Sequence, residues 1–191
     1  TLTYAYSTPS KGKIGSTAGS YTYTPTANAN GSDSFTITVS DGTATAEQAV
    51  TVAISAVDDS PVADSTSSLS VTEDEATQAT ITASEVDGQT LTYTYSTPSK
   101  GTISNTDGSY TYTPTANENG SDSFTVTISD GTSTDVVQTV SVEIAAVNDA
   151  PVTASTSSLS VSQNTAKSGT ITATDVDGDT LTYTYSTPSK G

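Results

Sequence analysis

Carboxylate side chains gather at two places in this sequence, each beside a proline. The group around Pro61 comprises Asp58, Asp59, Asp64, Glu73, Asp74, Glu75, Glu85 and Asp87. The group around Pro151 comprises Asp149, Asp175, Asp177 and Asp179, together with the amide side chain of Asn148. Two unit charges about 4 Å apart cost roughly 4 kcal/mol at an effective dielectric near 20. A hard divalent cation with several oxygen ligands removes that repulsion, so the clusters indicate metal sites.

Calcium is the cation that suits these clusters best, because the chain has no His or Cys and offers only oxygen ligands. The alternative is a solvated acidic face that keeps a long protein soluble. The clustering of the acids beside the prolines favours metal sites over a solvated acidic face, in which the acids would be evenly spaced. An EF-hand is excluded, because in "DVDGDT" (175–180) glycine comes fourth and the twelfth position would be Ser186.

The composition argues against several classes of function. With a formal net charge of −16, the surface repels nucleic acid and anionic membranes. No stretch approaches the roughly 20 apolar residues of a membrane span, so we expect no membrane insertion of this segment. The chain lacks His, Cys and Arg, which commonly act as base, nucleophile or oxyanion clamp. We therefore expect a protein that is not an enzyme.

The sequence is periodic. "TLTYAYSTPSKG" (1–12) returns at 90–101 and 180–191 with only its fifth position changed, and the segment 19–43 returns at 108–132. Such self-similarity is typical of tandem arrays. The prolines that follow the acidic pairs are typical of junctions, because proline stops strand pairing and stiffens a linker. We therefore expect a C-terminal part of one repeat (1–60), a complete repeat (61–150) and an N-terminal part of the next (151–191).

Within each repeat, apolar residues alternate with Thr or Ser, which predicts half-buried strands. Turn signals such as Asp107-Gly108 and Asn119-Gly120 separate about seven such strands in the complete repeat. The expected fold is all-β, with tandem seven-stranded antiparallel Greek-key sandwiches of immunoglobulin or cadherin type. Four tyrosines that alternate with Thr are predicted to lie in the core: Tyr93, Tyr95, Tyr110 and Tyr112.

Three motifs carry a resemblance to a known family. "AVNDAPV" (146–152) followed by "DVDGDTLTY" (175–183) resembles the cadherin linker and its later Asp-x-Asp loop. "VTEDEA" (71–76) resembles the first-turn glutamate motif, and "SDSFTVTISDG" (121–131) a strand that ends in Asp-Gly. The whole chain is similar to bacterial cadherin-like repeats, including the VCBS type, of large adhesins. This resemblance implies calcium at each junction and an extender role on the bacterial cell surface.

The resemblance also implies a ligand set for each junction. For the first junction it indicates Asp58, Asp59, Glu73, Glu85 and Asp87, with Asp33 and Asp41 as further ligands. For the second it indicates Asn148, Asp149, Asp175 and Asp177, with Asp122 and Asp130 behind them. In the third repeat Gln163 and Asn164 replace the acidic pair Glu73 and Asp74. Amide oxygens bind calcium without charge, so we expect weaker binding at the second junction.

Two further functions stay open beside a calcium-stiffened spacer. One is an adhesive module that grips a glycan or partner protein through tyrosine-rich loops. The other is a subunit of an extracellular filament. Residues 151–191 and 1–60 are complementary parts of one repeat, so identical chains could complete one another head to tail. The expected partners are thus calcium ions, neighbouring repeats and other copies of the chain.

Overall fold

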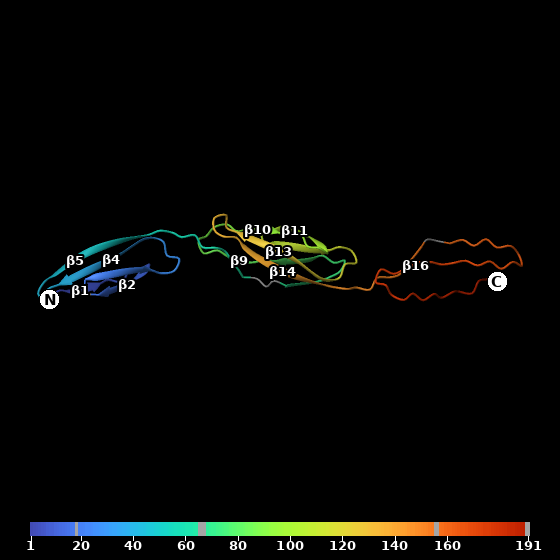
Figure 1. The fold of residues 1–191 in the computed structure, drawn as a ribbon, viewed down its shortest axis with the longest axis horizontal. Coiled ribbons are helices and arrows are strands. Elements are labelled where there is room, and N and C mark those ends of the chain that lie inside the picture. The colour runs from blue at the N-terminus through green and yellow to red at the C-terminus, as the bar shows by residue number, and fades with distance from the viewer. Residues whose placement is uncertain (18, 65–67, 155–156, 190–191) are drawn as a thin grey trace. The chain divides into compact units, whose positions relative to one another are not determined.

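The computed structural model describes residues 1–17, 19–64, 68–154 and 157–189. All of the regular secondary structure in these ranges is β-strand, as Figure 1 shows. No helix in the described ranges is long and apolar enough to cross a membrane. The chain forms two compact units, and each is described by itself. The first holds Thr1–Ala63, Ala83–Thr92 and Ile128–Val136, and the second holds Asp64–Thr82, Tyr93–Thr127 and Val137–Gly191.

The first unit is built on a long hairpin. Its strands are β1 (Thr3–Tyr6), β2 (Gly12–Thr17), β3 (Ser20–Pro25), β4 (Gly31–Ser40), β5 (Thr45–Ile54), β6 (Val62–Ala63) and β9 (Ala83–Ser84). Strands β4 and β5 pair antiparallel over ten residues each, and β1 adds to the other edge of β4. The β2–β3 hairpin packs on this sheet through Tyr21, whose ring meets that of Phe35 edge-on at 5.3 Å.

Most strands of the complete repeat lie in the second unit and form two sheets. The strands of this unit are β7 (Ser68–Thr72), β8 (Thr77–Thr80), β10 (Thr92–Tyr95), β11 (Gly101–Thr106), β12 (Ser109–Pro114), β13 (Gly120–Ser129) and β14 (Val136–Ala145) and, from residues 151–191, β15 (Val152–Thr153) and β16 (Ala173–Thr174). One sheet has the order β10-β13-β14-β7 and the other the order β11-β12-β8, while β15 pairs with β16. These two sheets confirm the predicted seven-stranded β-sandwich.

The core of the sandwich follows the period-two alternation of the sequence. Every second residue from Phe124 to Ile128 in β13 and from Val140 to Ile144 in β14 is at most 2% exposed: Phe124, Val126, Ile128, Val140, Val142 and Ile144. Tyr110 and Tyr112 of β12 contribute buried rings, 5.4 and 6.4 Å from the ring of Phe124. Tyr93 and Tyr95 are half-buried. Burial of the four tyrosines is therefore complete for two and partial for two.

One strand pair departs from the expected antiparallel pattern. Strand β7 pairs parallel with β14, with Ser141 opposite Ser68 and Ala145 opposite Thr72. The next strand along the chain, β8, joins the other sheet, where it pairs with β12. Because β7 and β8 belong to different sheets, β7 has no hairpin partner and takes the free edge of β14. Strands β7 and β14 therefore end side by side.

A partly buried hydrogen-bond network explains why "TPSKG" and "SDSF" recur together. Asp122 in β13 accepts hydrogen bonds from the Tyr112 hydroxyl (2.7 Å), the Lys100 amide (2.8 Å), and the amide and hydroxyl of Ser99 (3.1 and 2.8 Å). The Ser123 amide donates to the same carboxylate. We call this set the aspartate anchor. It ties the turn before β11 to β12 and β13.

The first repeat contains the same anchor around Asp33, with its Tyr23 hydroxyl at 2.7 Å and Lys11 amide at 2.8 Å.

Burial acts to raise the pKa of Asp122, but the hydrogen bonds from Tyr112, Lys100, Ser99 and Ser123 outweigh it and hold that pKa well below its usual range. The carboxylate is therefore stabilised in its charged form. A group with a lowered pKa stabilises the fold above its unfolded pKa, near 3.9, and this contribution is lost as pH falls through the folded value.

We predict that Asp122→Asn lowers the free energy of unfolding at pH 7 by about 1–3 kcal/mol, because an amide nitrogen cannot accept the bonds that the carboxylate accepts. As the pH falls below 5, the variant should also lose less stability than the parent. Urea unfolding followed by tyrosine fluorescence measures both effects. Asp107→Asn is the control, since Asp107 is exposed in the turn between β11 and β12. Equal losses in the two variants would contradict the anchor.

Candidate metal centre

The buried carboxylate of Glu73 is the first part of the candidate centre. Glu73 directly follows β7 and is only 1% exposed. Its amide donates to the carbonyl of Ala145 at 3.0 Å, which continues the parallel pairing of β7 with β14. Its two carboxylate oxygens accept one hydrogen bond each, from the Val147 amide at 2.5 Å and the Asn119 side chain at 3.3 Å. Since each oxygen has two lone pairs, acceptor capacity remains.

Glu73, Asp149 and Asp177 together form the candidate centre. Each offers one carboxylate oxygen, and the three oxygens lie within 4.8 Å of one another. In the described part of the chain, these are the three acidic residues that converge in this way. The Asp149 amide donates to Asp177 at 2.7 Å, and the Asp177 amide donates to Asp175 at 3.1 Å. The loop after β16 is thus fastened to the linker.

The charges of this group are only partly compensated by protein donors. Oδ2 of Asp149 is buried and has no hydrogen-bond partner. Burial of this carboxylate, followed by the charges of Asp177, Asp74, Glu73 and Asp175, raises the pKa of Asp149. Cations are the ligands that such a concentration of uncompensated negative charge favours. The all-oxygen set fits a hard divalent ion such as calcium.

The structure groups Glu73 differently from the ligand set that the resemblance implied, which placed Glu73 at the first junction. The structure brings Glu73 together with Asp149 and Asp177, because parallel pairing places the end of β7 beside the end of β14 and hence beside the linker after it. The prediction of weaker binding at the second junction depended on that placement. The turn that contributes to this junction is the acidic one at 71–76, rather than the amide-bearing turn that contains Gln163 and Asn164.

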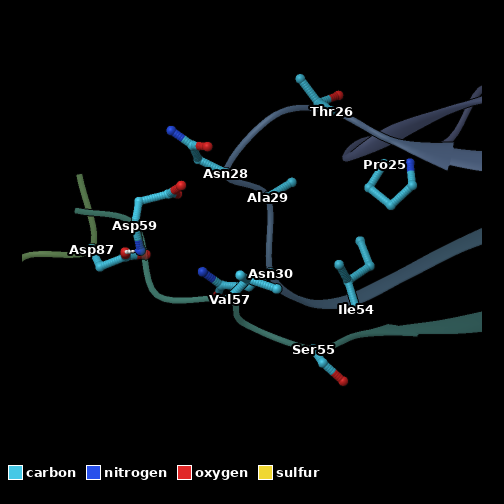
Figure 2. Close-up of a pocket in the computed structure, with 10 residues that line it drawn as sticks. All are labelled: Pro25, Thr26, Asn28, Ala29, Asn30, Ile54, Ser55, Val57, Asp59 and Asp87. Carbon is cyan, nitrogen blue, oxygen red and sulfur yellow. Dashed lines mark hydrogen bonds between the residues drawn. The ribbon is translucent and has the colours of Figure 1, made fainter. Parts of the chain in front are cut away.

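The first junction repeats part of this geometry. The Asp59 amide donates to Asp87 at 2.8 Å, as Figure 2 shows, and the Asp87 amide donates to Glu85 at 2.9 Å. Oε2 of Glu85 is buried and lacks a hydrogen-bond partner. Asp58 accepts a hydrogen bond from the side chain of Gln89. A counterpart of Glu73 would fall 89 residues earlier, outside the sequence, and these acids do not converge as a group of three within 4.8 Å.

The remaining predicted ligands are engaged by the protein itself. Asp33 and Asp122 are the aspartate anchors described above. Asp41 and Asp130 bind the turns that follow β4 and β13: Oδ1 of Asp41 accepts from the amides of Thr43 and Ala44, each at 2.8 Å. Hydrogen bonds lower the pKa of Asp41 to about 2, chiefly those from the amides of Ala44 and Thr43. The structure gives these four aspartates roles in the fold, away from the converging group.

Two contributors to the centre were missed by reading the sequence. Asn119 was interpreted only as a turn residue, yet its side chain donates to Glu73. The Val147 amide, two residues before Asp149, donates to the same carboxylate. The Asn-Gly pair signalled the turn correctly, but nothing local to it indicated a partner 46 positions away. Asn148, which was predicted as a ligand, donates through its side-chain amide to the carbonyl of Asp149 at 3.0 Å.

Several solved structures share the fold. A structure of protocadherin gammaB7 EC3-6, a cis-dimer, aligns with 92% of this chain at 17% identity and a TM-score of 0.52. Human protocadherin-24 EC1-2 aligns with 78% at 18% identity and a TM-score of 0.50, the match covering 83% of that chain. The endo-fucoidan hydrolase MfFcnA4 aligns at 24% identity with a TM-score of only 0.38, which carries no argument.

The chain spans about a quarter of the length of that hydrolase and about half of the protocadherin gammaB7 structure. A search of curated proteins found no match. The family model described as a bacterial Ig domain matches residues 1–53 and 58–143, which is well over half of the sequence. With its β-sandwich fold and cadherin-like structural neighbours, the chain belongs to the bacterial Ig domain family.

Proposed function

We propose that this chain is part of an extender, a spacer of a bacterial surface or secreted adhesin, and that calcium stiffens it at the junctions between repeats. The observation that carries the proposal is the convergence of Glu73, Asp149 and Asp177 within 4.8 Å. A spacer needs length and no unique surface, and near-identical repeats meet that need. The finer resemblance to the VCBS type, and an extracellular location, belong to the same proposal.

Calcium would act by joining segments that lie far apart in the sequence. Glu73 follows β7 in the complete repeat, Asp149 lies in the linker, and Asp177 lies in the loop after β16. An ion that binds all three would hold the linker to both flanking segments. Each carboxylate would gain a counter-charge, and the buried oxygen of Asp149 would gain the partner that it lacks. A linker held at both sides resists bending.

The alternative of a directly adhesive module is supported less well. It depended on tyrosines that could offer flat contact area to a glycan or a partner protein. Tyr110 and Tyr112 are 4% and 0% exposed and pack against Phe124, so they are not available for binding. Burial of these two rings favours a spacer, in which Tyr110 and Tyr112 serve the core.

We predict that Glu73→Gln weakens calcium binding by roughly tenfold or more, since calcium affinity depends on the number of charged ligands. Titration calorimetry of the 191-residue chain measures the affinity. Calcium should also raise the unfolding temperature of the parent chain more than that of the variant, because a ligand stabilises the folded state that binds it. Glu75→Gln is the control, because Glu75 lies in the same turn but is exposed. An unchanged affinity in Glu73→Gln would refute the centre.

The spacer function makes a separate prediction about dimensions. In small-angle scattering, the chain should have a smaller radius of gyration and a broader distribution of distances in chelator than in millimolar calcium. The physical reason is that repelling, unbridged carboxylates no longer hold the linker. Glu73→Gln should resemble the chelated parent even when calcium is present. Identical dimensions in both buffers would contradict stiffening by calcium, whatever the affinity.

A further inference from the structure

The turn that leads into β13 ends in an asparagine followed by a glycine, Asn119-Gly120. Gly120 has a φ of +83°, in the left-handed region that other residues adopt only with strain. The backbone of this turn therefore favours a glycine directly after the asparagine. Asn119 itself is exposed, so water has access to it.

Two charged side chains contact Asn119 through different groups. Lys100 donates from Nζ to the backbone carbonyl of Asn119 at 2.5 Å, while the side-chain amide of Asn119 donates to Oε2 of Glu73 at 3.3 Å. Glu73 is 1% exposed and belongs to the candidate metal centre. The carbonyl that Lys100 contacts is half of the peptide bond to Gly120. Asn119 thus has a cation at its peptide bond and a carboxylate at its side chain.

An asparagine that precedes glycine can modify itself with water as the only co-reactant. The Gly120 nitrogen loses its proton and forms a bond to Cγ of Asn119. The bond between Cγ and the side-chain nitrogen breaks, and that nitrogen leaves as ammonia with the proton. Water then opens the cyclic imide at either carbonyl, which gives aspartate or isoaspartate. Glycine permits this ring closure because it has no Cβ to obstruct it.

The ammonium group of Lys100 favours the first step of this reaction. When the Gly120 nitrogen loses its proton, negative charge spreads over the peptide group onto the carbonyl oxygen of Asn119. Nζ of Lys100 lies 2.5 Å from that oxygen and stabilises the charge as it develops. The other Asn-Gly pair of the sequence has the same arrangement, with Nζ of Lys11 at 2.7 Å from the carbonyl oxygen of Asn30.

We propose that Asn119 is a self-modification site, at which Lys100 promotes deamidation and the product adds a fourth carboxylate to the candidate metal centre. The effect on the centre rests on the proposed calcium function, whereas the reaction does not. In the aspartate product, an oxygen replaces the nitrogen that lies 3.3 Å from Oε2 of Glu73. A hydrogen-bond donor thereby becomes a charged acceptor. Because calcium affinity depends on the number of charged ligands, the centre gains affinity as the chain ages.

Peptide mapping by mass spectrometry tests the reaction on the 191-residue chain. During incubation at neutral pH in chelator, Asn119 should gain the mass difference between an amide and a carboxylic acid. Asn117 is the internal control, because it is exposed in the same turn but precedes a glutamate. Fragmentation of the peptide assigns the change to one asparagine or the other. Conversion of Asn119 that is no faster than that of Asn117 would overturn the proposal.

Lys100→Met tests the role of the cation, since the backbone amide that Lys100 donates to Asp122 stays in place. The variant should deamidate at Asn119 about two- to fivefold more slowly, which is the range expected for an exposed charge interaction. Lys100→Arg should recover most of the parent's rate, because it restores a cation. A lysine that only restrained the turn would give the opposite result. Faster conversion in Lys100→Met would therefore refute its promoting role.

Asn119→Asp tests the consequence for the centre, because it has the sequence of the aspartate product. Calorimetry should show a calcium affinity about tenfold above the parent's. In chelator the variant should unfold at a lower temperature than the parent, since Glu73 loses a donor and faces a further charge. Asn105→Asp, at an exposed position of β11, is the control and should change neither property.

The outcomes separate this proposal from the proposed function. An affinity equal to the parent's in Asn119→Asp would overturn the effect of deamidation on the centre. A parent chain that binds no calcium would refute the centre itself, and with it that effect. The mass measurement decides in either case whether Asn119 is modified, because it is made without calcium.

Discussion

The parallel pairing of β7 with β14 is the contact on which the other features depend. It covers the edge of β14, and the inward residues of that strand are consequently almost inaccessible. The same pairing ends β7 beside the start of the linker, so the residue that follows β7, Glu73, is buried against the backbone of Val147. One edge contact therefore completes the core and positions the buried carboxylate.

Carboxylates serve two different purposes in this chain, and their hydrogen-bond donors separate them. Asp122 is surrounded by amides and hydroxyls that saturate its acceptors, so its negative charge is stabilised by the fold. Glu73 and Asp149 face each other with Asp177, and one oxygen of Asp149 has no donor at all. The first arrangement holds a turn in place, whereas the second leaves capacity for a cation.

Repetition of the sequence produces repetition of the local geometry. The linker amide contacts the loop aspartate at both junctions, at 2.8 Å for Asp59 with Asp87 and 2.7 Å for Asp149 with Asp177. The aspartate anchor likewise occurs in both repeats with the same donors. These contacts join segments within about 30 residues of each other, so each copy of the sequence can form them. The environment of Glu73 differs, because it needs strands from both ends of a complete repeat.

Alternation along the strands and the turn signals were sufficient to predict the all-β fold, because a strand's two faces and its ends are local properties of the sequence. The acid clusters and the prolines beside them likewise indicated where a cation could bind. The grouping of those acids was not predictable in the same way. Glu73 was placed with the nearer acids in sequence, but it meets Asp149, 76 positions later, because β7 lies parallel to β14. Asp33 and Asp122 looked like further ligands, since a sequence shows a carboxylate but not the hydroxyl and amides that saturate it. The sequence by itself determined the strands, the repeats and the positions of the charges, and the tertiary structure decided which charges meet, because sheet pairing joins residues without regard to their separation along the chain.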